Sequence, residues 1–84
     1  MFDYSLFDDK TNYKVGLKQS LFELKHDNVL IMFVAKDADS FITRIPIEMA
    51  KEKAIEIVEI STKEELGEIC KIDISTAIAV VIKK

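Results

Sequence analysis

The sequence of 84 residues has few of the residues that interrupt or cross-link a chain: two glycines, one proline and one cysteine. Scarce glycine and proline leave few positions for long loops, so helices and strands should fill most of the chain. A single cysteine excludes an internal disulfide, and a reducing cytoplasm is the expected location. The first ten residues contain three aspartates and no apolar segment of signal-peptide length, so no secretory leader is expected.

Residues that usually carry catalysis or bind metals are equally scarce. The chain has one histidine and one cysteine, no pair of histidines and no glycine-rich phosphate loop. Cys70 follows Leu66 by four residues on an expected helix, which favours burial as a small apolar group. Asp37 and Asp39 offer two carboxylates, fewer than a metal cage needs, and helix capping explains them more simply. The sequence therefore predicts no enzyme, no cofactor and no metal site.

Positive charge is not in excess either. The net charge is −3 and the isoelectric point is near 5.1, whereas proteins that bind nucleic acid are usually basic. With 49% hydrophobic and 32% charged residues, the chain can bury a core and stay soluble, which favours one folded domain over residues 1–84. The longest apolar run has seven residues, against the roughly 20 that a membrane span needs, so no membrane partner is expected.

That run, residues 29–35, predicts the central strand of a sheet. Three of its residues are β-branched, as expected for a strand that is buried on both faces. The chain turns polar immediately afterwards, at Lys36 and Asp37. Because ligands gather at the carboxyl ends of such strands in open α/β sheets, functional residues are expected close to Lys36.

Two helices have clear signals. Leucines at positions 17, 21 and 24 share one side of a helix, which predicts an amphipathic helix over residues 17–26 that begins after Gly16. Thr62 and Glu65 fit a capping box, in which each residue binds the backbone of the other, and this predicts a helix over residues 63–70.

A further helix is expected after Asp37 or Asp39, either of which can cap it. Pro46 removes a backbone donor and clashes with the preceding turn, so we expect a kink or a restart, with the later part over residues 46–53. The residues expected on its buried apolar side are Phe41, Ile42, Ile45, Met49 and Ala50.

Strands are expected over residues 55–60 and 77–82, with a short edge strand over 13–15. The charges of residues 55–60 indicate a less central position than that of residues 29–35. The alternation of helices and strands predicts an α/β fold, a three-layer α/β/α sandwich with a small mixed sheet of about four strands. Residues 1–9 alternate apolar with polar side chains, which is typical of a half-buried strand but also fits a mobile tail or a partner-binding arm.

The start of the first helix is the main functional candidate. Gly16 permits close approach of a ligand to the backbone, and the unpaired N–H groups form a candidate phosphate site together with Lys18, Gln19 and Ser20. The competing interpretation is an ordinary helix end in contact with water.

Three segments, residues 16–20 (GLKQS), 34–39 (VAKDAD) and 62–70 (TKEELGEIC), resemble in order and spacing the ribosomal protein family of L-seven-Ae and L-thirty-e, in particular its short bacterial YbxF-like members. Residues 44–53 are similar to the leucine-proline helix of the archaeal members. The likeness covers residues 14–82 and leaves the N-terminal arm outside. It implies an α/β/α sandwich that binds kink-turn RNA, associates with ribosomal or other structured RNA, and catalyses no reaction.

The resemblance also implies a binding surface. The helix start would contact the bent RNA backbone and the edges of its sheared G·A pairs, and the turn at Lys36 would form a second wall. The loop over residues 70–74 would place apolar side chains against an exposed base, and lysines 14, 18, 36 and 71 would share one edge. The residues assigned to RNA in this way are Lys14, Gly16, Lys18, Gln19, Lys36, Asp37, Lys71, Ile72 and Ile74.

The sequence departs from the family pattern at three positions. Leu17 stands where bacterial relatives tend to have threonine, Phe22 where a phosphate-contacting lysine is expected, and Lys71 where a glycine is expected. Lys71 would be strained if the loop requires a positive φ. Phe22 could stack on a base, anchor a protein interface, or pack against the N-terminal arm.

These departures and the acidic balance support an alternative function, a protein-interaction or dimerisation module with weakened or lost RNA binding. Its interface would use Phe22 and the aromatic residues of the arm, Phe2, Tyr4 and Phe7. A further hypothesis is that the aspartates of the arm fold over the lysine edge and moderate RNA binding. These aspartates are Asp3, Asp8 and Asp9.

Overall fold

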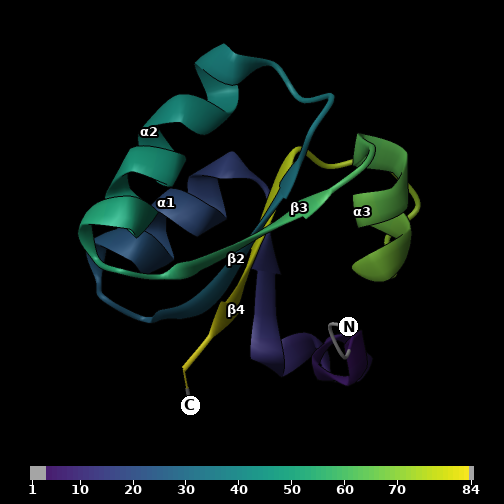
Figure 1. Ribbon diagram of the computed structural model, residues 1–84. Helices are drawn as coiled ribbons and strands as arrows, with labels where there is room; N and C mark the ends of the chain where they lie inside the picture. Colours follow the sequence, from purple (N-terminus) through teal and green to yellow (C-terminus); the bar gives the residue numbers. More distant parts are fainter. Residues whose placement is uncertain (1–3, 84) are drawn as a thin grey trace.

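The computed structural model describes residues 4–83, which form a four-stranded mixed sheet in the order β1-β4-β2-β3 (Figure 1). The strands are β1 (Tyr13–Val15), β2 (Val29–Ala35), β3 (Glu56–Ile60) and β4 (Ile78–Ile82). Strand β2 pairs parallel with β3 and antiparallel with β4, and β4 pairs antiparallel with β1. The two apolar strands are central, and the charged β3 is an edge strand, as predicted.

Helices cover both faces of this sheet. Helices α1 (Leu17–Lys25) and α2 (Ser40–Glu52) lie on one face, and α3 (Lys63–Ile69) lies on the other (Figure 1). The α1/α2 face buries a cluster that includes Leu24, Met32 and Val80. The α3 face buries a second cluster around Phe33 and Leu66. The predicted three-layer α/β/α sandwich is confirmed.

The central strand β2 is not buried along its whole length. A register shift between Val29 and Ile31 marks a β-bulge in its pairing with β4. The bulge places Val29 on the same face as Met32 and turns Leu30 toward solvent, where its side chain is 50% exposed. The expectation of a run buried on both faces therefore holds only for residues 32–35.

Helix α2 corrects two predictions. It is one helix of 13 residues that continues through Pro46, so the restart, one of the two expected outcomes beside a kink, is excluded. Of the residues expected on the buried side, Ala50 is buried and Met49 packs against the core, whereas Phe41, Ile42 and Ile45 are exposed. Thr43 and Pro46 are the other buried residues of the helix. The helix has apolar residues on two sides, and the side with the smaller side chains packs against the sheet because it allows a closer approach of the helix axis.

The N-terminal segment is part of the core. Residues Tyr4–Asp8 form a 3₁₀ helix, so the prediction of a strand is wrong for these residues. Phe7 is buried on the α3 face, with its ring centroid 4.8 Å from that of Tyr13 and 5.1 Å from that of Phe33. Phe2 and Asp3 lie outside the described residues. Phe7 is therefore a core residue and is not available to a partner.

All three helices end in the same motif, with a residue other than glycine in the left-handed region. The φ angles are 55° at Asp27, 57° at Ala54 and 60° at Lys71. After α2, for example, Ala54 N–H donates to Lys51 O at 3.1 Å and Ile55 N–H donates to Ala50 O at 2.9 Å. This is the Schellman arrangement, which normally places glycine at the left-handed position. The suspected strain at Lys71 is thus real, and two other positions share it.

Replacing Ala54 by glycine should stabilise the protein by about 0.5–1 kcal/mol. A residue with a Cβ costs about 1–2 kcal/mol in the left-handed region, and glycine removes this cost. The greater freedom of glycine in the unfolded chain offsets part of the gain. Urea unfolding followed by circular dichroism measures the change. Ala50→Gly, in the buried interior of the same helix, is the matched control and should destabilise. Equal destabilisation by both variants would contradict the conclusion that Ala54 is strained in the left-handed region.

Candidate nucleic-acid interface

The three helices begin at one edge of the sheet, here called the helix-start edge and formed by residues 16–19, 36–39 and 61–63 (Figure 1). Backbone hydrogen bonds join its segments. Gly16 N–H donates to Ile78 O at 2.9 Å, and Lys36 N–H donates to Ile60 O at 2.7 Å. The helix start at Gly16 and the strand exit at Lys36 are thus held to neighbouring strands of one sheet, which makes this edge a rigid surface.

Two of the helix starts at this edge are capped by side chains, and one is open. Asp39 accepts a hydrogen bond from Phe41 N–H at 2.9 Å at the start of α2. Thr62 Oγ1 accepts from Glu65 N–H at 3.0 Å at the start of α3, as the capping box predicted. Among the described residues, no side chain caps α1, whose N-cap residue is Gly16. The free N–H groups and the positive end of the α1 dipole can therefore bind an anion.

The surroundings of Gly16 fit such a ligand. Its backbone angles, φ 94° and ψ 163°, belong to a region that is almost restricted to glycine. A Cβ at this position would meet nothing within 4 Å, so the space beside the backbone is open. Lys18 and Gln19 follow with exposed side chains. The predicted residues of the first helix start are therefore brought together, apart from Ser20.

Ser20 does not belong to the interface. It is fully buried on the side of α1 that faces the sheet, and its hydroxyl has no hydrogen-bond partner among the residues that the structure describes. The buried side also includes Glu23, whose carboxylate accepts a hydrogen bond from Asn28 Nδ2 at 2.8 Å. The leucine pattern alone missed these two polar residues. Ser20 lies four residues before Leu24, so its helical spacing was an available signal, whereas Glu23, next to Leu24, had none.

Asp37 has a structural partner. Its carboxylate accepts a hydrogen bond from Lys63 N–H at 2.8 Å and so adds a second cap to α3, across 26 positions of sequence. Lys36, next to it, is exposed at the same edge. Asp37 thus positions α3 relative to the strand exit, and Lys36 offers its charge to a ligand.

Lys71 lies at the other end of α3 and not at the helix-start edge. Asp37 binds the first residue of α3, while Lys71 follows its last turn, and seven helical residues span about 10 Å. The Lys71 ammonium pairs with the Asp8 carboxylate at 2.6 Å. Lys14 lies on β1 with its side chain on the face opposite to Tyr13. The expectation that lysines 14, 18, 36 and 71 share one edge is therefore wrong for Lys71.

The loop after Lys71 returns along α3 to the helix-start edge, where Thr76 N–H donates to Lys63 O at 3.2 Å. Ile72 packs against the core, whereas Ile74 is 73% exposed. The loop lies so close to α3 that a Cβ on Gly67 would approach Ile74 O to 2.2 Å. Of the two isoleucines predicted to meet a base, only Ile74 presents its side chain.

Cys70 and Tyr13 form the buried end of this region. Tyr13 donates its hydroxyl proton to Cys70 O at 2.7 Å. Burial raises the pKa of the Cys70 thiol to about 12, and burial likewise raises the pKa of Tyr13. A thiol that stays protonated at neutral pH is a poor nucleophile, so the expected role of Cys70 as a small core residue is confirmed.

Phe22 lies on the outer side of α1 and is 54% exposed. Its ring stacks on that of His26, with centroids 4.3 Å apart and an interplanar angle of 25°. The described part of the N-terminal segment lies on the opposite face of the sheet, with α3 (Figure 1). Packing of Phe22 against residues 4–8 is therefore excluded, and contact with a base or with a protein remains a hypothesis.

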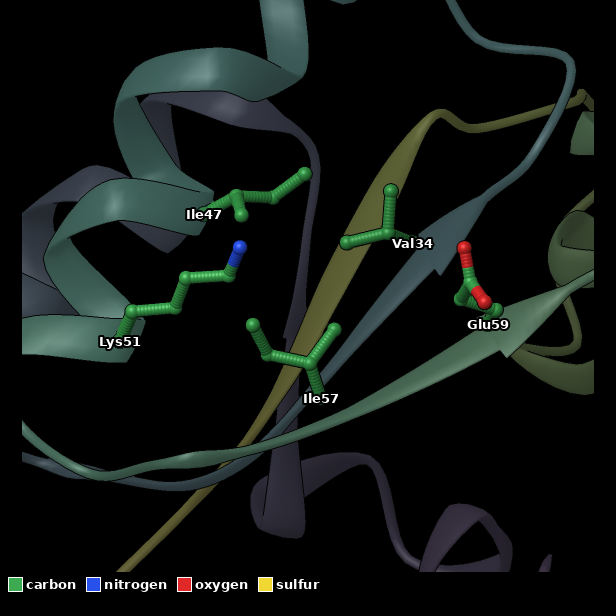
Figure 2. A pocket seen from close by; sticks show the side chains of 5 residues that line it. All are labelled: Val34, Ile47, Lys51, Ile57 and Glu59. Atoms are coloured by element: carbon green, nitrogen blue, oxygen red, sulfur yellow. The ribbon is translucent and has the colours of Figure 1, made fainter.

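A shallow open pocket of about 360 Å³ lies between α2 and the edge strand β3. Figure 2 shows its apolar floor, formed by Val34, Ile47 and Ile57, with the Lys51 ammonium and the Glu59 carboxylate on either side. None of the residues predicted to bind RNA lines it. Within residues 4–83, no three His, Cys, Asp or Glu side chains are grouped as a metal site requires. No helix in that range has the length and apolar character to cross a bilayer.

A sequence model of the ribosomal protein L7Ae/L30e/S12e/Gadd45 family matches residues 5–84. The chain belongs to this family. The match begins at residue 5, so residues 5–9 of the N-terminal arm, which was expected to lie outside the likeness, are included, in agreement with the buried position of Phe7.

Individual proteins are similar to most of this chain. An RNA-binding protein of Caldanaerobacter subterraneus subsp. tengcongensis is 40% identical over 65 residues, 77% of this chain and 79% of the relative. An RNA-binding protein of Halalkalibacterium halodurans is 33% identical over 81 residues, 96% of this chain and 98% of the relative. Among solved structures, the 15.5kD RNA binding protein of Giardia lamblia superposes with a TM-score of 0.84 at 22% identity, covering 96% of this chain and 71% of that chain.

Replacing Asp37 by alanine should destabilise the protein by about 1 kcal/mol, because α3 loses a capping carboxylate. Lys36→Ala is the matched control at the adjacent exposed position and should change the stability by less than about 0.5 kcal/mol. The free energies of unfolding of both variants in urea test this division. If the Lys36 variant is as unstable as the Asp37 variant, the capping role is not specific to Asp37.

Proposed function

We propose that residues 1–84 act as one domain that binds structured RNA of the kink-turn type, in a ribosomal or other ribonucleoprotein particle of the cytoplasm, and that they catalyse no reaction. The observation that carries this proposal is the uncapped start of α1, in a chain whose family relatives include proteins named as RNA-binding. A sharply bent RNA presents phosphates and unpaired base edges together. Backbone N–H groups at a helix start can bind its phosphates.

The proposed contacts follow the positions of the side chains. Gly16, Lys18 and Gln19 would meet the RNA backbone and the edges of the G·A pairs, and Lys36 would bind a neighbouring phosphate. Ile74 would lie against an exposed base. Lys14 and Asp37 border these contacts, and Ile72 supports the loop that carries Ile74. Lys71 lies at the far end of α3, where an RNA that extends along this helix would reach it.

Replacing Lys18 by alanine should weaken the binding of a kink-turn RNA. If the ammonium of Lys18 neutralises one phosphate, its loss also lowers the slope of log K against log salt by about 0.9. Titration of a labelled kink-turn duplex at several salt concentrations measures both quantities. The matched control is Lys25→Ala, at the far end of the same helix, which should bind as the wild type does.

The wild-type protein should also prefer the kink-turn duplex over the same duplex with its G·A pairs mutated. Equal affinity for the two duplexes at low salt would refute the proposed function, whatever the behaviour of the lysine variants.

If the RNA extends from the helix-start edge along α3, replacing Asp8 by asparagine should strengthen its binding and steepen the salt dependence. The reason is that the ammonium of Lys71, at the far end of α3, loses its carboxylate partner and becomes available to a phosphate. Deletion of residues 1–9 is a poorer test, since it removes Phe7 from the core. Asp73→Asn is the matched control, because it removes one exposed negative charge from the loop that follows Lys71 and leaves the Asp8–Lys71 ion pair intact. If the Asp8 and Asp73 variants bind the RNA with the same affinity, the change in net charge and not the release of Lys71 explains the effect.

Protein binding on the same fold is the second candidate function. It is favoured by Phe22, a half-exposed aromatic side chain at the position where the resemblance implies a lysine. An aromatic ring does not replace the charge of a lysine at a phosphate. A module that has lost its RNA surface would show no preference for the kink-turn duplex in the titration described above.

A further inference from the structure

The outward side of α2 carries the most exposed aromatic side chain found in residues 5–83. Phe41 is 89% exposed, Ile45 is 52% exposed and Ile42 is 40% exposed. The three residues are neighbours on the first two turns of α2. Scattered apolar residues are normal on a protein surface, but a contiguous group of large ones usually marks an interface.

Charged residues of both signs accompany this apolar group. At 100° per residue, Phe41, Ile45, Glu48 and Glu52 lie within about 60° of one another around the helix axis, opposite the buried side. Arg44 flanks this stripe. Arg44 and Glu48 are exposed, and neither takes part in the ion pairs of residues 4–83. Their charges are therefore available to a partner.

We propose that this outward side of α2 is a homodimer interface, in which α2 packs antiparallel against α2 of a second copy across a twofold axis close to Pro46. A twofold axis makes the two contact surfaces identical, so the surface must be complementary to itself. The stripe on α2, formed by Phe41, Ile45, Glu48 and Glu52 and flanked by Arg44, is complementary to itself in this sense.

The pairing follows from the helix geometry. With the axis level with Pro46, a residue two positions before Pro46 lies opposite a residue two positions after it. Arg44 then lies level with Glu48 of the second copy, on the same flank of the contact, and the symmetry repeats the ion pair. The two Ile45 side chains meet near the axis, and Ile42 lies close to Met49 of the second copy. Both apolar and charged groups find partners.

A second copy fits this stripe better than RNA does. Glu48 and Glu52 lie among the apolar residues, and their carboxylates would repel phosphates at close range. The antiparallel arrangement instead places the acidic half of one helix beside the half of its partner that carries Arg44. Opposite charges placed in this way also select the register of the contact.

Charge exchange tests the proposed pairing directly. Arg44→Glu and Glu48→Arg should each shift the dimer toward monomer, because each places like charges opposite each other. An equimolar mixture of these two variants should form a heterodimer, and the double variant should dimerise as the wild type does. Analytical ultracentrifugation from micromolar to near-millimolar concentration measures these masses at physiological salt.

Truncation of the apolar anchor gives a second measurement. Phe41→Ala should weaken dimerisation by about tenfold or more, as expected for the largest apolar side chain of the contact. Phe22→Ala is the matched control, since it removes an exposed phenylalanine from α1, and it should leave the dimer unchanged. Circular dichroism of each variant verifies the fold.

The proposal is overturned if the wild type is a monomer at the highest concentration, if Phe22→Ala rather than Phe41→Ala weakens the dimer, or if the two charge variants fail to associate when mixed. A monomeric wild type whose Phe41→Ala variant loses affinity for kink-turn RNA would assign the stripe to RNA instead.

Discussion

The structure depends on burying both faces of the paired strands β2 and β4. Residues 32–35 of β2 and 78–81 of β4 are all buried, so each face of the sheet needs its own cover. Helices α1 and α2 cover one face, and α3 with Phe7 covers the other. Because β1, β2 and β3 run in the same direction, the helix after each strand begins at the same edge. The gathering of three helix starts is thus a consequence of the sheet topology.

Local sequence patterns predicted most helices and strands, but they did not predict how these elements pack against one another. The strands and the helix starts at Gly16 and Thr62 were evident from periodicity and capping residues. The orientation of α2 was not, because apolar side chains lie on two sides of it and only the approach to the sheet selects Thr43, Pro46 and Ala50. The role of Phe7 was missed because a short 3₁₀ segment has no long periodic pattern.

The same limit applies to the candidate site. The open start of α1 could be predicted, since Gly16, Lys18 and Gln19 are adjacent in sequence. Helix capping by Asp37 or Asp39 was expected, but partners far away in the sequence could not be predicted. Asp37 binds the backbone of Lys63, and Asp8 binds the side chain of Lys71, 63 positions away. Sequence patterns identify a charged side chain, but the fold decides whether that charge is already used.

This distinction explains how an acidic chain can present a surface for phosphates. Charges separated by more than about 8 Å are largely screened at physiological salt, so the local arrangement matters more than the net charge of −3. At the helix-start edge, Asp37 and Asp39 accept backbone hydrogen bonds, while Lys18 and Lys36 are exposed. The acidic residues of α2 lie on its outward side, away from the sheet. Hydrogen bonding does not remove the charges of Asp37 and Asp39, so this edge carries charges of both signs. The open helix start with Lys18 and Lys36 is the part of the edge that suits a phosphate.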